Sequence, residues 1–324
     1  MASPLEQLAA GALDWLERNL DHFDPFSASA GPATPDSATP GRTKAGQAKA
    51  ALELALLCHC AARPGRAPEA LDGALDGATA LVRKLWQHPD FPPLFDEDPA
   101  YASTYGLIFA ALAPDGIDDT LCRGTLARLD PGFLSSPGRS PYRRIELRHY
   151  ADKAGVRHTI EPYAELVPRS PLVALRAAGP GEAGSQDEAA PLTTPEAYAL
   201  THTAFYLGDF GRTAPGLSEG ERAHAEDLVD RMLRHCVAHD RWDLAAELVL
   251  TQFILGSDPL RTPSGAAAVE CLARAQRPDG AIPGRSAALT APPSAPAEEF
   301  FRKAYHTTLV TALMALAVTS PGPS

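Results

Sequence analysis

The chain has 324 residues, a hydrophobic content of 45% and a formal net charge of −11. This apolar fraction is enough for a sizeable core, and an acidic chain without a basic stripe argues against nucleic acid or an anionic membrane as a partner. No apolar run reaches the roughly 18 residues of a membrane-spanning helix, and the amino-terminal segment lacks the features of a signal peptide. We therefore expect a cytoplasmic protein. The five cysteines, without a Cys-x-x-Cys pair, fit free thiols in a reducing compartment.

Segments with helical periodicity recur in pairs along the chain, each pair joined by a loop or turn. The segment 162–178 holds three prolines and is ambiguous, although it could hold the outer helix of the fourth pair. Alternating runs rich in β-branched residues, which are typical of strands, are missing. The predicted helices, pair by pair, are 5–23 with 44–62, 70–87 with 100–112, 118–129 with 143–154, 162–178 with 196–210, 218–237 with 242–255, and 265–275 with 305–318.

Six helix pairs at a spacing of roughly 45 to 55 residues predict a repeat architecture. We predict one all-α domain over 1–324, in which the pairs close into an α/α toroid with one helix of each pair inside and the other outside. An open helical-repeat superhelix is the alternative. The Pro-, Ala-, Gly- and Ser-rich segments 27–43, 179–193 and 282–300 are predicted as long loops over the rim of a pocket, and 319–324 as a disordered tail.

The run Gln276-x-x-Asp279-Gly280-Ala281, followed by Tyr305-His306-Thr307-Thr308, resembles the last repeat of the α/α-toroid superfamily. That superfamily includes protein prenyltransferase β subunits and triterpene cyclases. The resemblance implies a turn before an inner helix and, as in the prenyltransferases, a zinc-binding histidine that matches His306. Two departures count against a direct transfer: no Asp-x-Asp-Asp motif is present, and the Asp and Cys zinc ligands have no clear match.

A second resemblance concerns the run Glu196–Arg212, which is similar to a motif of uncharacterised actinobacterial proteins. That motif implies no activity. The composition, rich in Ala, Arg and Pro, fits a high-GC source of that kind.

Polar side chains on the second helix of each pair are the candidate site, because the toroid turns these helices toward a common centre. Two imidazoles and one carboxylate with an open position suit a divalent metal such as zinc or iron. A metal-free acid–base site and a purely structural pairing of buried charges are the other interpretations. The candidate catalytic residues are His202, Glu247, His149 and Tyr198. The candidate metal ligands are His202, Asp243, Glu247 and His306, with His149 as a fourth ligand or nearby base.

From this pattern we expect an enzyme of specialised metabolism that acts on a small molecule or a modified peptide in the central pocket. Acid–base or divalent-metal chemistry of a lyase, cyclase or transferase would fit such a site. The alternative is a non-catalytic helical-repeat protein that binds a partner or carrier protein. Neither interpretation calls for a nucleic acid or a membrane.

Overall fold

The computed structural model describes residues 3–27, 44–62, 69–130, 132–135, 138–177, 190–284 and 297–319. Over these ranges the chain consists of helices, turns and loops without a strand, which confirms the predicted all-α class. All five cysteines lie in this part and are free. Within the same ranges, no helix combines the length and the apolar character needed to cross a bilayer.

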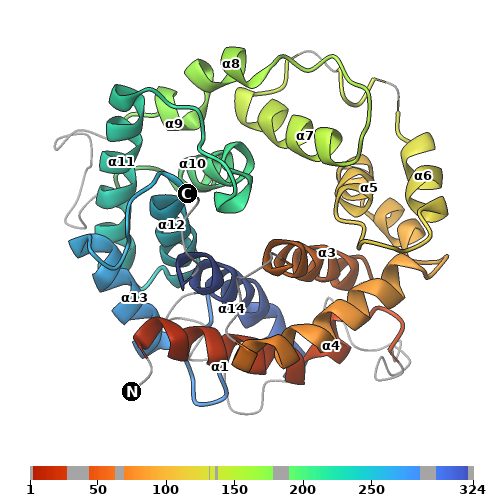
Figure 1. Ribbon diagram of the computed structural model, residues 1–324, viewed down its shortest axis with the longest axis horizontal. Coiled ribbons are helices and arrows are strands. Elements are labelled where there is room, and N and C mark those ends of the chain that lie inside the picture. The colour runs from red at the N-terminus through yellow and green to blue at the C-terminus, as the bar shows by residue number, and fades with distance from the viewer. Residues whose placement is uncertain are drawn as a thin grey trace, which may run out of the picture.

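The longer helices are arranged as an inner and an outer ring (Figure 1). Each inner helix packs on the next, and the last packs on the first, so these helices form a closed ring. The inner helices are α3 (Lys44–Ala61), α5 (Ala102–Ala111), α7 (Pro141–Lys153), α10 (Thr194–Leu207), α12 (Trp242–Ile254) and α14 (Ala297–Thr319). The outer helices are α1 (Pro4–Arg18), α4 (Glu69–Trp86), α6 (Thr120–Ala127), α11 (Glu219–Ala238) and α13 (Pro263–Ala275).

Shorter helical segments connect the longer ones. They are α2 (Leu20–Phe23), η1 (Pro92–Glu97), α8 (Tyr163–Leu166), η2 (Val167–Arg169), α9 (Pro171–Ala174) and η3 (Asp209–Gly211). The predicted helix 162–178 is therefore broken into α8, η2 and α9. Proline is the physical reason, because Pro168 and Pro171 lack the N–H group that would continue a helical hydrogen-bond ladder.

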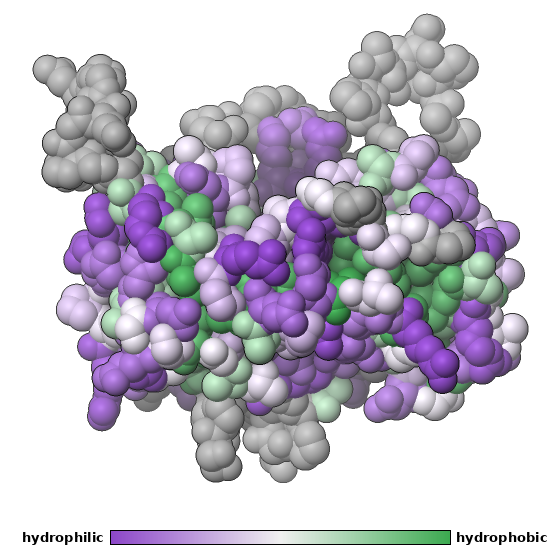
Figure 2. All heavy atoms as spheres, turned by 90° about the horizontal axis from the view of Figure 1, so that it is seen from above, coloured by the Kyte–Doolittle hydropathy of each residue, from purple (hydrophilic) through white to green (hydrophobic). Residues whose placement is uncertain are grey.

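The sequence of each helix explains its place in the two rings. The outer helix α1 is amphipathic, with Leu5, Leu8 and Leu16 buried and Asp14 exposed. The inner helix α12 is buried on nearly every side. The outside of the molecule carries many hydrophilic residues, with patches of hydrophobic residues between them (Figure 2). A stripe of apolar residues suits a helix with one covered face, whereas an apolar helix suits the layer covered from both sides.

The turn between α13 and α14 joins the end of the chain to its beginning. Gln276 Nε2 donates hydrogen bonds to the Leu8 and Gly280 carbonyls, both at 3.1 Å. Gly280 has a φ of +90°, and a Cβ atom there would lie 2.0 Å from the Gly11 carbonyl oxygen. Only glycine therefore fits this position. The motif that carries the resemblance to toroid proteins thus fastens α1 onto the last repeat.

Several predicted boundaries differ from the structure. Helix α14 begins at Ala297 rather than at Tyr305, so 297–300 is helical and His306 lies inside the helix. Its last residue is Thr319, so that part of the predicted tail is also helical. The connection between the predicted helices 70–87 and 100–112 contains the 3-10 helix η1, in which Leu94 and Phe95 are buried. The remainder of the predicted rim loops, at 28–43, 179–189 and 285–296, and the tail at 320–324 lie outside the described residues.

Candidate active site

A buried carboxylate on α12 is the centre of the candidate site. Glu247 has a side-chain exposure of 1%, and its Oε1 atom lies 3.5 Å from Nε2 of both His202 on α10 and His306 on α14. The other oxygen, Oε2, accepts a hydrogen bond of 2.6 Å from the Thr201 hydroxyl. A carboxylate is stable at such depth only when cations and hydrogen-bond donors surround it. The structure thus brings together three of the residues that the sequence singles out.

The outer nitrogens of the two imidazoles are held by residues that sequence analysis missed. His306 Nδ1 lies 2.9 Å from Oε2 of Glu53 on α3, and His202 Nδ1 lies 3.2 Å from the Tyr142 hydroxyl on α7. Glu53 is the one acidic residue of α3, which is otherwise largely apolar. A lone carboxylate on an apolar inner helix is the signal that could have found it.

The charges of this cluster favour the ionised forms of all four titratable groups. Burial would raise the pKa of Glu247, but the charges of His202 and His306 outweigh it and hold that pKa at about 2. Burial would lower the pKa of His306, but Glu53 and then Glu247 raise it to about 10. The pKa of His202 is raised for the same reason, mainly by Glu247, and the pKa of Glu53 is lowered mainly by His306. The His306–Glu53 pair is therefore ionised at neutral pH, and the Glu247 carboxylate favours the imidazolium form of His202.

Solvent reaches this cluster from the inside of the ring. The side chains of His202 and His306 are 30% and 39% exposed. Their helices are covered on the outside, α10 by α9 and α14 by α1. The open side of both imidazoles therefore faces the ring interior, where a substrate could reach them.

Two other predicted residues form a pair of their own. The Tyr198 hydroxyl donates a hydrogen bond of 2.5 Å to Oδ2 of Asp243. Burial and then the Asp243 carboxylate raise the pKa of Tyr198, so the phenol keeps its proton. Asp243 thus interacts with a phenol rather than with the two imidazoles.

His149 belongs to a different group of side chains. Its Nδ1 atom lies 3.1 Å from the Tyr206 carbonyl oxygen, and its Nε2 atom lies 3.9 Å from Oδ1 of Asp209. Burial, and then the charge of Lys153, lowers the pKa of His149 to about 4. The imidazole is therefore neutral at pH 7 and is placed to contact Asp209, not Glu247.

The metal hypothesis receives no support from the grouping of ligands. Among the described residues, no three His, Cys, Asp or Glu side chains are placed together as a metal ion requires. The Nδ1 atoms of His202 and His306 already have partners in Tyr142 and Glu53, and Asp243 is bonded to Tyr198. The groups at hand fit acid–base chemistry, which needs only a proton donor and acceptor within hydrogen-bond reach.

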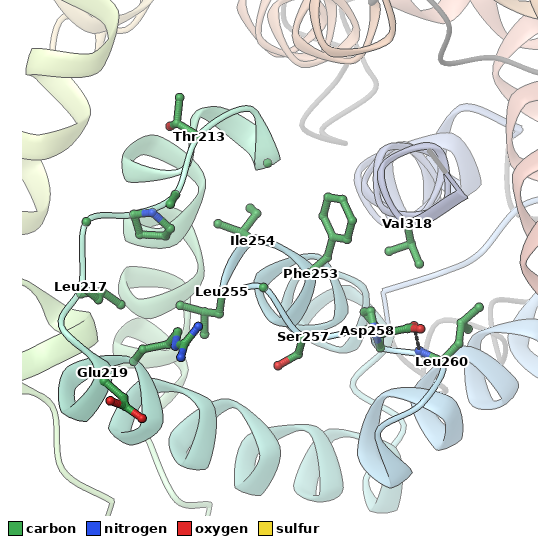
Figure 3. Close-up of a pocket in the computed structure, with 17 residues that line it drawn as sticks. Thr213, Leu217, Glu219, Phe253, Ile254, Leu255, Ser257, Asp258, Leu260 and Val318 are labelled. Atoms are coloured by element: carbon green, nitrogen blue, oxygen red, sulfur yellow. Dashed lines mark hydrogen bonds between the residues drawn. The ribbon is translucent and has the colours of Figure 1, made fainter. Parts of the chain in front are cut away.

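A cavity of about 850 Å³ lies at the carboxyl-terminal ends of α12 and α14, beside the turn that follows α10 (Figure 3). Phe253, Ile254 and Leu255 line it from the end of α12, and Val318 lines it from the end of α14. The sequence predicts a pocket at the opposite ends of these helices, below the long loops. The residues that line this cavity include none of the imidazole and carboxylate groups described above, so it is a separate feature of the surface.

Comparison with known proteins identifies one family. The sequence pattern of a domain of unknown function, DUF6895, matches residues 9–316. The chain belongs to this family. No curated protein and no solved structure matches the chain. The matched range begins in α1 and ends in α14, so a DUF6895 domain covers the whole ring described above.

Proposed function

We propose that this DUF6895 protein is an enzyme that performs acid–base chemistry on a small molecule or a modified peptide inside its helical ring. The observation that carries the proposal is the convergence of two imidazoles on one buried oxygen of Glu247, each at 3.5 Å. Burying a carboxylate with two cations costs free energy that an apolar core would avoid. Such sites are frequent where catalysis needs shifted pKa values.

The hydrogen bonds favour Tyr142 as the group that exchanges a proton with the substrate. Glu247 contacts His202 Nε2, and His202 Nδ1 contacts the Tyr142 hydroxyl at 3.2 Å. This order of carboxylate, imidazole and hydroxyl is the arrangement by which a base and its orienting group act on a hydroxyl. Burial raises the pKa of Tyr142, so the hydroxyl carries its proton at neutral pH, and the imidazole of His202 beside it can replace that proton once it is given up.

The proton balance of the step is simple. The Tyr142 hydroxyl gives its proton to a basic atom of the substrate, and the Nδ1–H group of the His202 imidazolium returns a proton to Tyr142. Glu247 then faces a neutral His202 and keeps it oriented, while His306 holds the charge of Glu247. The reverse sequence removes a proton from the substrate. Lyase, cyclase and isomerisation steps that begin with protonation fit this chemistry.

Specialised metabolism is part of the same proposal. The resemblance of the last repeat to cyclases and prenyltransferases supports it. The proposal places the substrate in the interior of the ring, next to the exposed sides of His202 and His306.

The test combines a gene deletion with purified variants. An untargeted comparison of metabolites should show a compound that accumulates in a deletion strain of the source organism. The purified wild-type protein should consume that compound, and Tyr142→Phe should do so about 100-fold or more slowly, because a positioned acid contributes about that factor. Tyr163→Phe is the matched control, since Tyr163 is a partly buried tyrosine on the outer segment α8.

Three results would count against the proposal. Equal turnover by Tyr142→Phe and wild type would remove the proposed proton donor. Loss of turnover after dialysis against a chelator, with recovery on adding zinc or iron, would favour the metal alternative. A deletion strain without any altered compound, together with a protein partner that co-purifies stoichiometrically, would favour the non-catalytic binding protein.

A further inference from the structure

A second group of charged side chains, at the other end of α10, has no role in the proposed proton transfer. It consists of His59, Lys153, Asp209 and Arg212, called the Asp209 cluster below. Lys153 Nζ lies 2.9 Å from Oδ1 of Asp209, and Arg212 Nη1 lies 2.8 Å from Nε2 of His59. Arg212 Nη2 also donates a hydrogen bond of 2.6 Å to the His59 carbonyl.

The contacts of Arg212 and Lys153 with His59 reach across the ring rather than around it. His59 is on α3, Lys153 is on α7, and Arg212 follows α10. In the ring, α5 lies between α3 and α7, and α7 lies between α5 and α10. Helix packing alone therefore does not bring these side chains together. The long cations of Lys153 and Arg212 connect inner helices that are not neighbours.

A strained turn places Asp209 and Arg212 in this position. Asp209 and Phe210 have φ values of 42° and 52°, and Gly211 follows with 84°. Left-handed conformations of two consecutive non-glycine residues are unfavourable and persist only where the surroundings enforce them. The surroundings do so here: Phe210 is 3% exposed, and a Cβ on Gly211 would lie 2.8 Å from the Phe253 ring.

The Asp209 cluster has an excess of positive charge and of hydrogen-bond donors. Burial, and then the charges of Arg212 and Lys153, lowers the pKa of His59 to about 4, so this imidazole is neutral and its Nε2 offers one lone pair. Lys153 Nζ lies 3.4 Å from the same Nε2, so two cationic donors compete for one acceptor. Among the groups in direct contact, the two cations Lys153 and Arg212 therefore face a single carboxylate, that of Asp209.

Solvent has access to these cations, so a small anion in solution can reach them. The side chains of Lys153 and Arg212 are 20% and 25% exposed. A further carboxylate, that of Asp115, also acts on His59 but is exposed, where water and salt screen its charge. An oxyanion would satisfy the surplus donors, and Arg in particular matches the geometry of carboxylate and phosphate groups.

The distance between the two clusters follows from helix geometry. Helix α10 continues for five residues after His202, to Leu207, which corresponds to about 8 Å at 1.5 Å per residue, and Asp209 lies just beyond the end of the helix. His59 comes six residues after Glu53 on α3, which corresponds to about 9 Å. Two helices thus give a similar separation between the level of the imidazole pair and the level of the Asp209 cluster.

We infer that Lys153 and Arg212 form a binding site for an oxyanion, a carboxylate or a phosphate monoester, at this level of the ring. The assignment of that oxyanion to the substrate rests on the proposed function. It predicts an elongated anionic substrate whose negative group lies on the order of 10 to 16 Å from the atom that Tyr142 protonates, because Lys153 comes 11 residues after Tyr142 on α7, about 16 Å along that helix. The oxyanion site itself is independent of catalysis and can be tested without the substrate.

The experiment is isothermal titration calorimetry of the full chain at low ionic strength, with inorganic phosphate in one series and butyrate in another. Wild type should show saturable binding at one site per chain for at least one of these anions. Arg212→Gln should weaken that binding by about tenfold or more, because a charge-assisted hydrogen bond is lost. Arg83→Gln is the matched control, since the Arg83 guanidinium also donates to a backbone carbonyl, that of Asp115.

Lys153→Gln is the second variant, and it decides the matter if Arg212→Gln does not fold. Weaker binding in either folded variant, with unchanged binding in Arg83→Gln, supports the site. Absence of saturable binding by wild type in both series would overturn it, as would equal binding by wild type and both variants. Tyr142→Phe should bind the anions like wild type, so failure of the catalytic proposal remains distinguishable from failure of this one.

Discussion

The replacement Glu247→Gln tests whether the buried carboxylate sets the charge state of the two imidazoles. Glutamine keeps the shape of the side chain, and its carbonyl oxygen can still accept the hydrogen bond from Thr201. The variant therefore removes one negative charge and leaves the packing intact. We expect the pKa of His202 to fall, since burial alone lowers it and Glu247 is its ion-pair partner. His306 should keep a raised pKa, because Glu53 remains 2.9 Å away.

The size of the fall follows from the distance and the exposure. Two unit charges 3.5 Å apart interact by about 1 kcal/mol at the dielectric constant of water and by about 5 kcal/mol at an effective constant of about 20. At 1.36 kcal/mol per pH unit, these limits correspond to a fall of about 1 to 3.5 units. Because the His202 side chain is 30% exposed and partly screened by water, we expect about 1 to 2 units.

The assay is a pH titration of the imidazole nitrogens by NMR on the uniformly labelled protein. The ten histidines are assigned through single replacements. Asp243→Asn is the matched control on the same helix, and it should leave the pKa of His202 unchanged because Asp243 bonds Tyr198. A pKa of His202 that stays within about 0.3 units of wild type in Glu247→Gln would refute the electrostatic account, since 0.3 units is below the weakest coupling calculated.

Two further predictions concern stability. Gly280→Ala should lower the free energy of unfolding by about 3 kcal/mol, because it combines an unfavourable φ of +90° with a clash against the Gly11 carbonyl. Gly216→Ala is the control: its φ is +74° but the space around it is open, so it should cost about 1 kcal/mol. If urea denaturation gave the same loss of unfolding free energy for both variants, the close approach of Gly280 to the Gly11 carbonyl would not be what requires glycine at this turn. The second concerns His149, whose pKa near 4 means that the folded chain holds it neutral. The neutral His149 contributes fully to the free energy of unfolding above the ordinary pKa of 6.5. This contribution is lost as the pH falls toward 4, which lowers the free energy of unfolding by up to about 3 kcal/mol. His149→Gln should flatten the stability profile between these pH values, and an identical profile in variant and wild type would show that another group is responsible.

The helices and their pairing were accessible from the sequence because helix formation is local. The 3.6-residue spacing of leucines and alanines, with proline and glycine between the segments, predicts the inner helices α3, α5, α7, α10 and α12 close to their observed positions. The start of α14 was missed because 297–304 is not an apolar stripe, and its helicity depends on packing against α1. The local sequence pattern carries no information about this packing between distant helices.

The composition of the site could be foreseen only in part. Helical spacing indicates which residues share a face, and it selected His202 and Glu247. It does not fix the height or rotation of one helix relative to the next. For that reason it did not separate Asp243, which bonds Tyr198, from Glu247, which contacts the imidazoles. The same limit applies to Glu53, which is 253 residues from its partner His306.

The sequence by itself determined an all-α chain whose apolar inner helices carry a few polar residues, because burial and helix propensity act on neighbouring residues. Only the tertiary structure decided which of those polar residues meet. Closing the ring places α3 beside α14 and lets Arg212 reach His59 across it, and these contacts depend on the relative positions of whole helices. Charge pairing over a few ångströms is a property of that arrangement, and no periodicity along the chain encodes it.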